Sequence, residues 1–467
     1  MDHDYSELID RFVDENIEGF KADLKRLVDI KSVAGKQEGT APYGLGVAKA
    51  LHEALTIAGE AGLKPTDCDG HIGYAHYGDE DRFIGIIGHI DVVPEGNGWN
   101  TDPYNLVECG GYLLGRGTED DKGGFMIGLY AVKFLIENGV PLRYGIRLLA
   151  GCDEEVGMSD IEYYKAHCKM PLFTMTPDAE FPVCCGEKGI YSADLISRRP
   201  VSDSIIELRG GVASNAVPDL ATALLDCPLE AAQQAAQGAD HITVRGRDGR
   251  VTVIADGISA HAGEPAPGLS AIVLLCRFLA GSGLVPQDSE LLAAIVELLE
   301  VNDGSRFGIA SDDGIFTPLT IIGGMISLDE GRHIVQNLNC RYPTSITDAE
   351  LNERIAASAG RLGYELANVQ DGNPPHYIPA DSPAIGALMN AYNEVTGRSE
   401  KPYVMSGGTY ARHIPNAVAF GINFDGSKKP DFVGSIHGKN EGYSIESAKA
   451  AIKIYIRALI ALQNVEL

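Results

Sequence analysis

The feature that most constrains the fold of this chain is a set of short apolar runs, each followed by ionisable residues. The runs occupy residues 83–89, 144–151 and 172–178, and their lengths are typical of buried strands. Between the first two runs, residues 123–139 form a longer apolar segment closed by a glycine, which predicts a helix. Strands that alternate with helices indicate an α/β sheet with crossover helices.

The middle of the chain has a different pattern. Residues 242–257 alternate apolar and polar side chains around an Asp-Gly pair, which predicts a β-hairpin. Residues 268–301 are predicted to be helical, and residues 319–331 and 333–343 read as further antiparallel strands. This region therefore resembles an α+β domain rather than a continuation of the α/β pattern.

The change of pattern predicts an α/β domain interrupted by an insertion. We expect the α/β domain to comprise residues 1–188 and 381–467, and the inserted α+β domain to comprise residues 189–380. Further elements expected in the α/β domain are helices at 5–28, 44–62, 382–397 and 444–463 and a buried strand at 417–426.

Charge and cysteine content exclude several classes of protein. Acidic residues outnumber basic ones 65 to 38, giving a formal net charge of −27, and such a surface repels nucleic acid. The nine cysteines contain no C-x-x-C pair, which fits a reducing compartment. The acidic start of the chain is unlike a signal peptide, and no apolar stretch approaches a membrane span. We expect a cytoplasmic protein that binds neither nucleic acid nor membranes.

The residues that follow the strands are the candidates for chemistry. These residues are His89 and Asp91 after the first run, Glu154 and Glu155 after the second, Asp178 after the third, and Asp120 and Asp121 just before the helix. The carboxyl ends of strands in an open α/β sheet converge on the ligand crevice. Carboxylates packed together there repel one another, so they must take up protons or bind cations.

Charge balance favours cations. Asp120, Glu155 and Asp178 carry three negative charges, which together with one hydroxide balance two divalent ions if His89 and His437 are neutral. Imidazole and carboxylate ligands with an open position suit hydrolytic zinc, and they also admit cobalt or manganese. Each motif alone has an ordinary structural explanation, such as a core histidine or a helix start. Their combination, each after a strand, predicts a metal site.

Six motifs in this order resemble the M20 metallopeptidase family, in its PepV-like dipeptidase branch. The motifs are "GHIDVVP", "GRGTEDDKGG", "CDEEVG", "TPD", "DGISAHAGEP" and "SIHGKNEG", and they span nearly the whole chain. The resemblance implies a zinc-peptidase-like catalytic domain with a mixed sheet and flanking helices. It also implies that the inserted α+β domain is a lid.

The resemblance further implies a site for two zinc ions, with manganese or cobalt as alternatives. The implied ligands are His89 and Asp178 for one ion, Glu155 and His437 for the other, and Asp120 as a bridge between them. A cis peptide bond is implied between Asp120 and Asp121. Asp91 is expected to orient the His89 ring through a hydrogen bond.

Catalysis and substrate binding are assigned in the same way. Glu154 is implied as the general base that takes a proton from the attacking water, and His261 as the donor to the oxyanion. The residues implied for substrate binding are Arg341, Asn215, Gly407 and Gly408. An arginine suits bidentate capture of a free C-terminal carboxylate.

The expected function is therefore metal-dependent hydrolysis of dipeptides with a free C-terminal carboxylate. The alternative is an N-acyl amino acid deacylase of the same family, either a deacetylase or a desuccinylase. The expected partner is a small peptide substrate, and the chain is expected to be a monomer, with a dimer as the alternative. One departure from the family pattern is Gly442, which stands after "HGKNE" where an aromatic residue often follows.

Overall fold

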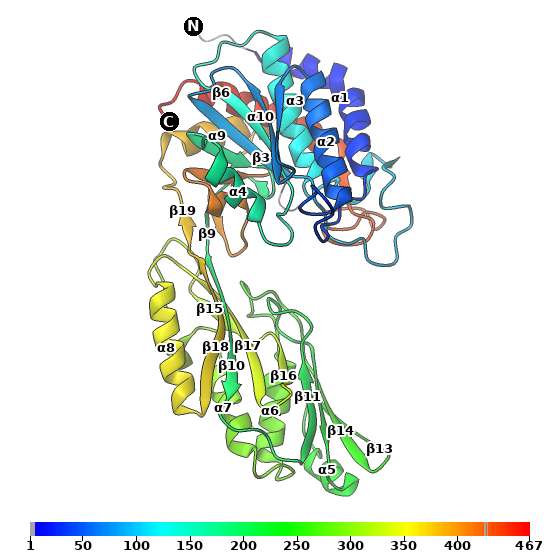
Figure 1. The fold of residues 1–467 in the computed structure, drawn as a ribbon, viewed down its shortest axis with the longest axis vertical. Coiled ribbons are helices and arrows are strands. Elements are labelled where there is room, and N and C mark those ends of the chain that lie inside the picture. Colours follow the sequence, from blue (N-terminus) through cyan, green and yellow to red (C-terminus); the bar gives the residue numbers. More distant parts are fainter. Residues whose placement is uncertain (1–4, 425, 427) are drawn as a thin grey trace. The chain divides into compact units, whose positions relative to one another are not determined.

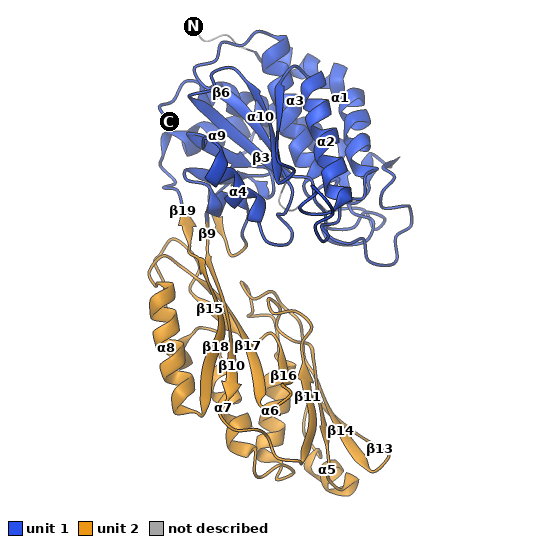
Figure 2. Ribbon diagram, in the orientation of Figure 1, with its two compact units in different colours: residues 1–186, 377–403, 408–467 blue, residues 187–376, 404–407 orange. Residues whose placement is uncertain are grey.

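The computed structural model describes residues 5–424, 426 and 428–467 of the chain. These residues form two compact units, Met1–Gly186 with Tyr377–Tyr403 and Gly408–Leu467, and Glu187–His376 with Val404–Gly407 (Figure 2). The domain boundaries expected from the sequence fall after residues 188 and 380. The segment 404–407, which is expected in the α/β domain, clusters here with the inserted unit.

The first unit is built on a mixed sheet (Figure 1). Its strand order is β1 (Lys64–Cys68), β2 (Ile72–Tyr77), β6 (Gly145–Gly151), β3 (Phe83–His89), β7 (Phe173–Thr176), β21 (Ala417–Phe420), β9 (Val183–Glu187) and β19 (His376–Tyr377), with β20 (Tyr403–Met405) pairing β9. Strand β3 runs parallel to β6 and β7, so the carboxyl ends of these three strands meet at one edge. Strand β2 is antiparallel to β6, and β9 is antiparallel to β21.

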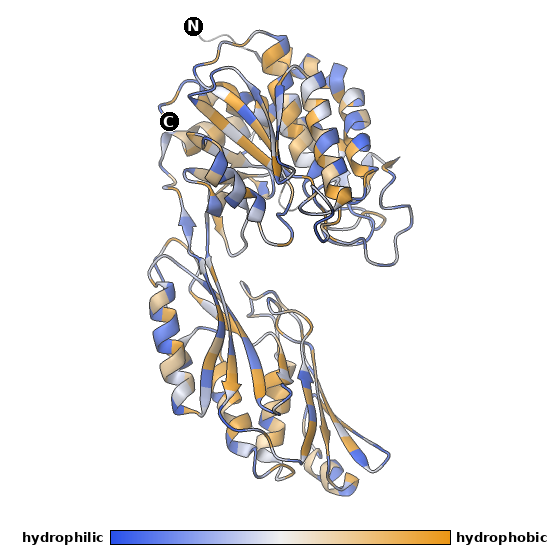
Figure 3. Cartoon of the chain, in the orientation of Figure 1, coloured by the Kyte–Doolittle hydropathy of each residue, from blue (hydrophilic) through white to orange (hydrophobic). Residues whose placement is uncertain are grey.

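Helices cover both faces of this sheet. They are α1 (Ser6–Val28), α2 (Leu45–Glu60), α3 (Lys122–Glu137), α4 (Ser159–His167), α9 (Pro383–Thr396), α10 (Ile445–Leu462) and the 3-10 turn η2 (Tyr410–His413). Ile86 of β3 lies against Gly128 of α3, whereas Ile87 belongs to a buried cluster with Tyr164 of α4 and Tyr410 of η2. Two covered faces explain why β3 is apolar up to its last residue, His89, and buried at every position (Figure 3).

Two small sheets complete the first unit. One consists of β23 (Gly442–Ser444), β5 (Tyr112–Leu114) and β4 (Val107–Cys109), and the other pairs β22 (Asn423–Phe424) with β8 (Glu180–Phe181). In the first of these sheets, Gly442 pairs with Leu114. This pairing brings the late "HGKNEG" segment beside the "GRGTEDDK" segment, more than three hundred residues earlier.

The second unit has an antiparallel sheet with its helices packed into one core. The strand order is β13 (Ile242–Arg247), β14 (Arg250–Asp256), β12 (Leu220–Leu225), β11 (Ile205–Gly210), β16 (Ile326–Leu328), β17 (Ile334–Tyr342), β10 (Gly189–Ser197) and β18 (Tyr364–Asn373), with β15 (Thr320–Ile322) pairing β17. The helices are α5 (Leu229–Ala235), α6 (Ala271–Gly281), α7 (Ser289–Leu299) and α8 (Asp348–Arg361), with a 3-10 turn η1 (Ser305–Phe307).

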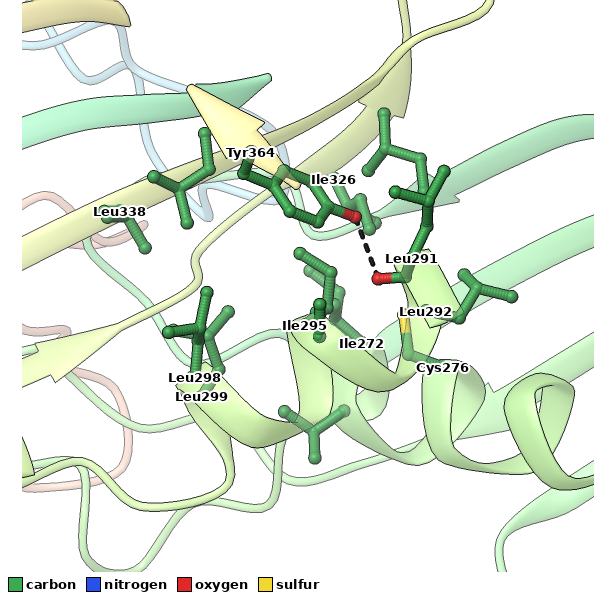
Figure 4. Close-up of a cluster of buried hydrophobic side chains, with 14 of the residues drawn as sticks. Ile272, Cys276, Leu291, Leu292, Ile295, Leu298, Leu299, Ile326, Leu338 and Tyr364 are labelled. Carbon is green, nitrogen blue, oxygen red and sulfur yellow. Dashed lines mark hydrogen bonds between the residues drawn. The ribbon is translucent and has the colours of Figure 1, made fainter. Parts of the chain in front are cut away.

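Burial alternates along β10, as expected for a sheet covered on one face. Residues of α6, α7 and the sheet share one hydrophobic cluster, part of which is drawn in Figure 4. Within it, the Tyr364 hydroxyl donates a hydrogen bond to the Leu291 carbonyl at 3.0 Å, which satisfies the polar atom that this large side chain brings into the core.

The fold class expected from the sequence is confirmed, and the elements differ in detail. The predicted hairpin is present, with Asp248 and Gly249 both at positive φ in its turn. The helical region 268–301 is two helices, because a segment with Gly and Pro separates α6 from α7. The strand expected at 417–426 is divided into β21 and β22, and residue 425 lies outside the described residues.

Within the described part of the chain, no helix is both long enough and apolar enough to cross a bilayer.

Candidate metal centre

His89 stands at the end of β3 with its imidazole fully buried. Its Nδ1 donates to the backbone carbonyl of Asp91 at 2.9 Å, which directs Nε2 toward Asp120. The sequence predicts a hydrogen bond between Asp91 and this ring. The acceptor in the structure is the backbone carbonyl of Asp91 rather than its carboxylate, whose Oδ1 lies 3.6 Å from Nδ1.

The carboxylate of Asp91 has a different set of contacts. It accepts the backbone N–H of Glu154 at 3.3 Å and that of Glu155 at 3.2 Å. These two glutamates stand in the turn after β6, the strand that neighbours β3. Asp91 therefore connects the ends of two parallel strands, through its carbonyl on one side and its carboxylate on the other.

Asp120 lies between two imidazoles. Its Oδ1 is 3.0 Å from Nε2 of His89, and its Oδ2 is 2.9 Å from Nε2 of His437. The neighbouring Asp121 differs, because its Oδ2 accepts the backbone N–H of His89 at 3.2 Å. The peptide bond between the two aspartates is cis, as the family resemblance implied. Of the two side chains, it is that of Asp120 which joins both histidines.

Glu155 and Asp178 complete two groups of ligand atoms. The first group contains His89, Glu154 and Asp178, and the second contains His89, Asp120 and Glu155, with the atoms of each group within 4.8 Å of one another. His437 joins the second group, since its Nε2 lies 3.2 Å from Oε2 of Glu155. The structure thus brings together all five residues that the sequence analysis named as metal ligands.

His437 differs from the other members in its exposure. Its side chain is 54% exposed, whereas those of Asp120 and Glu155 are each 9% exposed. It stands in the loop before β23 with φ of +60°, a conformation that is uncommon outside glycine. The other members of the two groups are buried or partly buried, so His437 is the most exposed of the proposed ligands.

The clustered carboxylates of this site require positive charge close to them, and the pKa values of the site show this. Hydrogen bonds with Asp120 and then Glu155 raise the pKa of His437 to about 10. Burial acts to lower the pKa of His89, but the hydrogen bond and charge of Asp120 raise it well above its ordinary value. Burial also acts to raise the pKa of Asp120, yet its hydrogen bonds to the two imidazoles hold it well below its usual range.

The pKa of Glu154 is shifted in the direction opposite to that of Asp120. Burial, followed by the charge of Asp178, raises the pKa of its carboxyl well above the ordinary value. These raised pKa values favour the protonated forms of Glu154 and of the two imidazoles, and the added protons offset the negative charge of the clustered carboxylates. Divalent cations supply the same positive charge when they displace those protons.

The donor set fits divalent metal ions. Imidazole nitrogens and carboxylate oxygens are the ligands of hydrolytic zinc, and of cobalt or manganese. Oε1 of Glu155 is buried and has no hydrogen-bond partner among the described residues, so one lone-pair direction in the site is unsatisfied. Buried polar atoms are almost always paired, and an ion at this position would supply the partner.

The other residues named from the sequence lie mostly in the second unit, where several are neighbours. Arg341 on β17 is buried, and its guanidinium donates to Oδ1 of Asn339 and to the carbonyl of Ser406, both at 3.1 Å. Ser406 precedes Gly407, which belongs to the same unit. Gly408 is assigned to the first unit.

His261 and Asn215 are also close to one another. The residue after His261 donates its backbone N–H to the Asn215 carbonyl at 2.9 Å, and Ala216 forms an isolated β-bridge with His261. Burial, and then the positive charge of Arg341, lower the pKa of His261 below its ordinary value. The imidazole, the guanidinium and the segment leading to Gly407 thus form one polar cluster within the inserted unit.

Sequence reasoning missed three buried residues around the centre. Asp160 accepts the Tyr410 hydroxyl at 2.5 Å and the Cys152 N–H at 2.6 Å, which fixes the turn that carries Glu154. Arg116 and Glu441 form an ion pair between the loops that carry Asp120 and His437. Both residues of this ion pair stand in motifs quoted from the sequence, "GRG" and "NEG", but only the fold shows that these motifs meet.

Comparison with known proteins gives consistent results at the level of family and fold. The model of "Peptidase family M20/M25/M40" matches residues 85–461. A Bacillus subtilis (strain 168) protein named "Putative dipeptidase YtjP" is 30% identical over 439 residues, which cover 90% of this chain and 92% of the relative. A Staphylococcus saprophyticus protein of the same description, SSP1012, is 33% identical over 456 residues, covering 94% of this chain and 96% of the relative.

Two solved structures show the same architecture. The Saccharomyces cerevisiae di-peptidase Dug1p aligns over the full length of both chains with a TM-score of 0.57, and human carnosine dipeptidase 1 aligns over 99% of this chain and 100% of its own with a TM-score of 0.54. Each is 15% identical to this chain, so these likenesses concern the fold alone. The family match across most of the chain and the full-length relatives lead to one conclusion: the chain belongs to the M20/M25/M40 peptidase family.

Proposed function

We propose that this chain is a metal-dependent dipeptidase that hydrolyses dipeptides with a free C-terminal carboxylate. The observation that carries the proposal is the position of Asp120, whose two carboxylate oxygens lie 3.0 and 2.9 Å from the imidazoles of His89 and His437. Each oxygen of Asp120 could therefore bind a different divalent ion together with the imidazole beside it, and paired ions about 3.5–4 Å apart are a common arrangement in hydrolytic sites. The relatives named as dipeptidases support dipeptides as the substrate class.

The proposed ligands follow from the groups that the side chains form. His89 and Asp178 would hold one ion, Glu155 and His437 the other, and Asp120 both, with zinc favoured and manganese or cobalt as alternatives. When bound, the ions polarise the scissile carbonyl and make a water nucleophilic near neutral pH.

Glu154 is the proposed general base. It stands beside His89 and Asp178 in the first group of ligand atoms, and its backbone N–H is held by the Asp91 carboxylate. From this position its carboxylate takes a proton from the attacking water and passes it to the leaving amine. Burial, followed by the charge of Asp178, raises the pKa of this carboxyl, which favours a group that can hold a proton and release it.

Arg341 is proposed to bind the C-terminal carboxylate of the substrate. Its guanidinium is held by Asn339 and Ser406, so its orientation is already fixed before a ligand arrives. A guanidinium with a fixed orientation suits bidentate binding of a carboxylate. His261 is proposed to donate a hydrogen bond to the developing oxyanion, with Asn215, Gly407 and Gly408 contributing further substrate contacts.

A substrate panel tests the proposal. The enzyme is stripped with a chelator and assayed with dipeptides, tripeptides, N-acetyl amino acids and N-succinyl amino acids, before and after addition of zinc, manganese or cobalt. The proposal predicts that dipeptide hydrolysis is lost on chelation and restored by metal. Hydrolysis of acylated amino acids without any dipeptide hydrolysis would instead identify a deacylase and contradict the proposal.

A further inference from the structure

Arg116 and Glu441 form a buried ion pair that the proposed reaction does not use. Nη1 of Arg116 lies 2.6 Å from Oε2 of Glu441, and the two side chains are 1% and 0% exposed. Arg116 follows β5, and Glu441 immediately precedes β23. The pairing of Gly442 with Leu114 in these two strands places the two side chains together.

Glu441 fixes the backbone of the loop that ends at Asp120. Its Oε1 accepts the backbone N–H of Gly117 and of Glu119 at 3.0 Å and that of Asp120 at 3.2 Å. Its own carbonyl accepts the N–H of Gly115 at 3.0 Å. A single side-chain oxygen thus accepts three backbone N–H groups of one irregular loop, and the last of these donors belongs to the proposed bridging ligand.

Arg116 contacts the loop that carries His437. Its Nη2 donates to the carbonyl of His437 at 3.2 Å and to the carbonyl of Pro94 at 3.3 Å. The guanidinium also lies over the ring of Trp99, at 5.3 Å from its centroid. The pair as a whole therefore connects the backbone at Asp120, the backbone at His437 and the segment that follows Asp91.

Stability alone is a poor explanation for this pair. Burying two charges is costly, and a buried ion pair is often no more stabilising than apolar side chains of similar size. In addition, Nε of Arg116 is buried with no hydrogen-bond partner among the described residues. What the pair does provide is a fixed relation between two loops that are distant in sequence.

We propose that Arg116 and Glu441 are positioning residues that hold Asp120 and His437 at the separation required to bind the same cation. This inference rests on the metal site of the proposed function. Neither residue touches an ion or a substrate in this account, because both act through the backbone of the loops that carry the ligands. Groups that orient metal ligands typically change metal affinity by about 10- to 100-fold when they are removed.

Zinc affinity of the full-length chain tests the inference. Glu441→Gln and Arg116→Lys are titrated with zinc against a competing chelator, alongside the wild type. We expect at least one of the two ions to bind about 10- to 100-fold more weakly in each variant. Since the site is loosened rather than removed, excess zinc is expected to restore dipeptide hydrolysis by Glu441→Gln, whereas it should not restore hydrolysis by Glu154→Gln.

Asp288 in the second unit offers a matched control. Its buried carboxylate also accepts a backbone N–H, that of Ser202 at 3.0 Å, and pairs with Arg199 at 3.1 Å. Asp288→Asn is expected to lower the unfolding temperature while leaving zinc affinity unchanged, because all proposed ligands belong to the other unit. Equal weakening of zinc binding by Asp288→Asn and Glu441→Gln would overturn the inference, because it would reduce the effect to general destabilisation.

Arg116→Lys covers the case in which Glu441→Gln does not fold, and the wild type separates this inference from the proposed function. If Glu441→Gln fails to fold, Arg116→Lys decides the matter, because it keeps the charge and alters the contact to the His437 carbonyl. Wild-type zinc affinity in a folded Arg116→Lys variant overturns the inference. Wild-type protein that binds two zinc ions but cleaves no dipeptide contradicts the proposed substrate alone, whereas wild-type protein that binds no zinc contradicts both.

Discussion

At the scale of single residues, Glu154 and Glu155 have different surroundings although they are adjacent in sequence. Oε2 of Glu155 lies 3.2 Å from the His437 imidazole, while Glu154 is grouped with His89 and Asp178. The backbone N–H groups of both glutamates are held by the same carboxylate, that of Asp91. Neighbours held in this way can have separate roles, one as a proposed ligand and one as a proposed base.

The first prediction concerns the proposed base. Glu154→Gln keeps the shape of the side chain and removes its ability to take a proton, so we expect kcat to fall by about 10²- to 10⁴-fold. Zinc content should remain as in the wild type, and it is measured by elemental analysis of the same samples. Glu137→Gln, an exposed change on α3, is the control and should leave kcat unchanged. A fully active Glu154→Gln with full metal content would remove Glu154 from the mechanism.

The second prediction concerns Arg341. If its guanidinium binds the C-terminal carboxylate, Arg341→Ala should reduce kcat/KM for free dipeptides by about 10- to 100-fold, the usual value of a charge-assisted hydrogen bond. The same dipeptides with an amidated C-terminus should be affected much less. Arg245→Ala, at an exposed position of β13, is the control. Equal losses on free and amidated dipeptides would contradict this role.

At the scale of elements, the parallel strands explain how distant residues meet. β3, β6 and β7 are neighbours and parallel, so the residues that follow them reach the same edge of the sheet. The apolar runs predicted these strands correctly, because both faces of the sheet are covered and most positions of the three strands together are occupied by apolar residues. The ionisable residues just beyond each run therefore marked the position of the candidate site.

Other elements could not be predicted, for physical reasons. The strands β1, β2 and β10 were not identified from the sequence. β1 is an edge strand and every second position of β10 is only partly buried, so polar residues interrupt the apolar pattern in these two strands. The role of the Asp91 carbonyl was also beyond prediction, since every residue carries a carbonyl and only the geometry selects one. The ion pair of Arg116 with Glu441 depends on the pairing of β5 with β23, which short-range patterns do not contain.

The third prediction tests the packing of α3 on the sheet. A Cβ atom at Gly128 would lie 3.0 Å from Ile86 and 3.2 Å from Leu148, so Gly128→Val overpacks this contact and should lower the free energy of unfolding by about 1–3 kcal/mol. Gly386 in α9 is the matched control, because nothing lies within 4 Å of its Cβ position. Gly386→Val should stay within about 0.5 kcal/mol of the wild type. Urea denaturation followed by circular dichroism compares the two variants, and equal midpoints would contradict the packing argument.

At the scale of the whole molecule, each unit has its own core and its own candidate residues. The hydrophobic cluster of the second unit contains only residues of that unit. Its first and last strands are neighbours, with Ile190 paired to Asn373, so the ends of the inserted segment lie in adjacent strands. Such an arrangement allows a domain to be inserted into another without disturbing either core. All five proposed metal ligands belong to the first unit.

The fourth prediction follows from this division. A fragment of residues 187–376 retains the complete hydrophobic cluster of the second unit, so we expect it to fold and to unfold cooperatively on heating. It lacks His89, Asp120 and the other proposed ligands, so zinc should not change its unfolding temperature. Near-ultraviolet circular dichroism and calorimetry, with and without zinc, provide the measurement. A fragment without a cooperative transition would show that the inserted unit depends on the rest of the chain.

The central claim is that Asp120, His89, His437, Glu155 and Asp178 form one site for two divalent ions. The most direct measurement is the number of zinc ions bound per chain, by equilibrium dialysis, in the wild type and in Asp120→Ala. Two ions per chain are predicted for the wild type, and the variant should lose tight binding of both, because the carboxylate shared by the two imidazoles is gone. A wild type without bound zinc, or an Asp120→Ala variant that binds two ions as tightly as the wild type, would contradict the account.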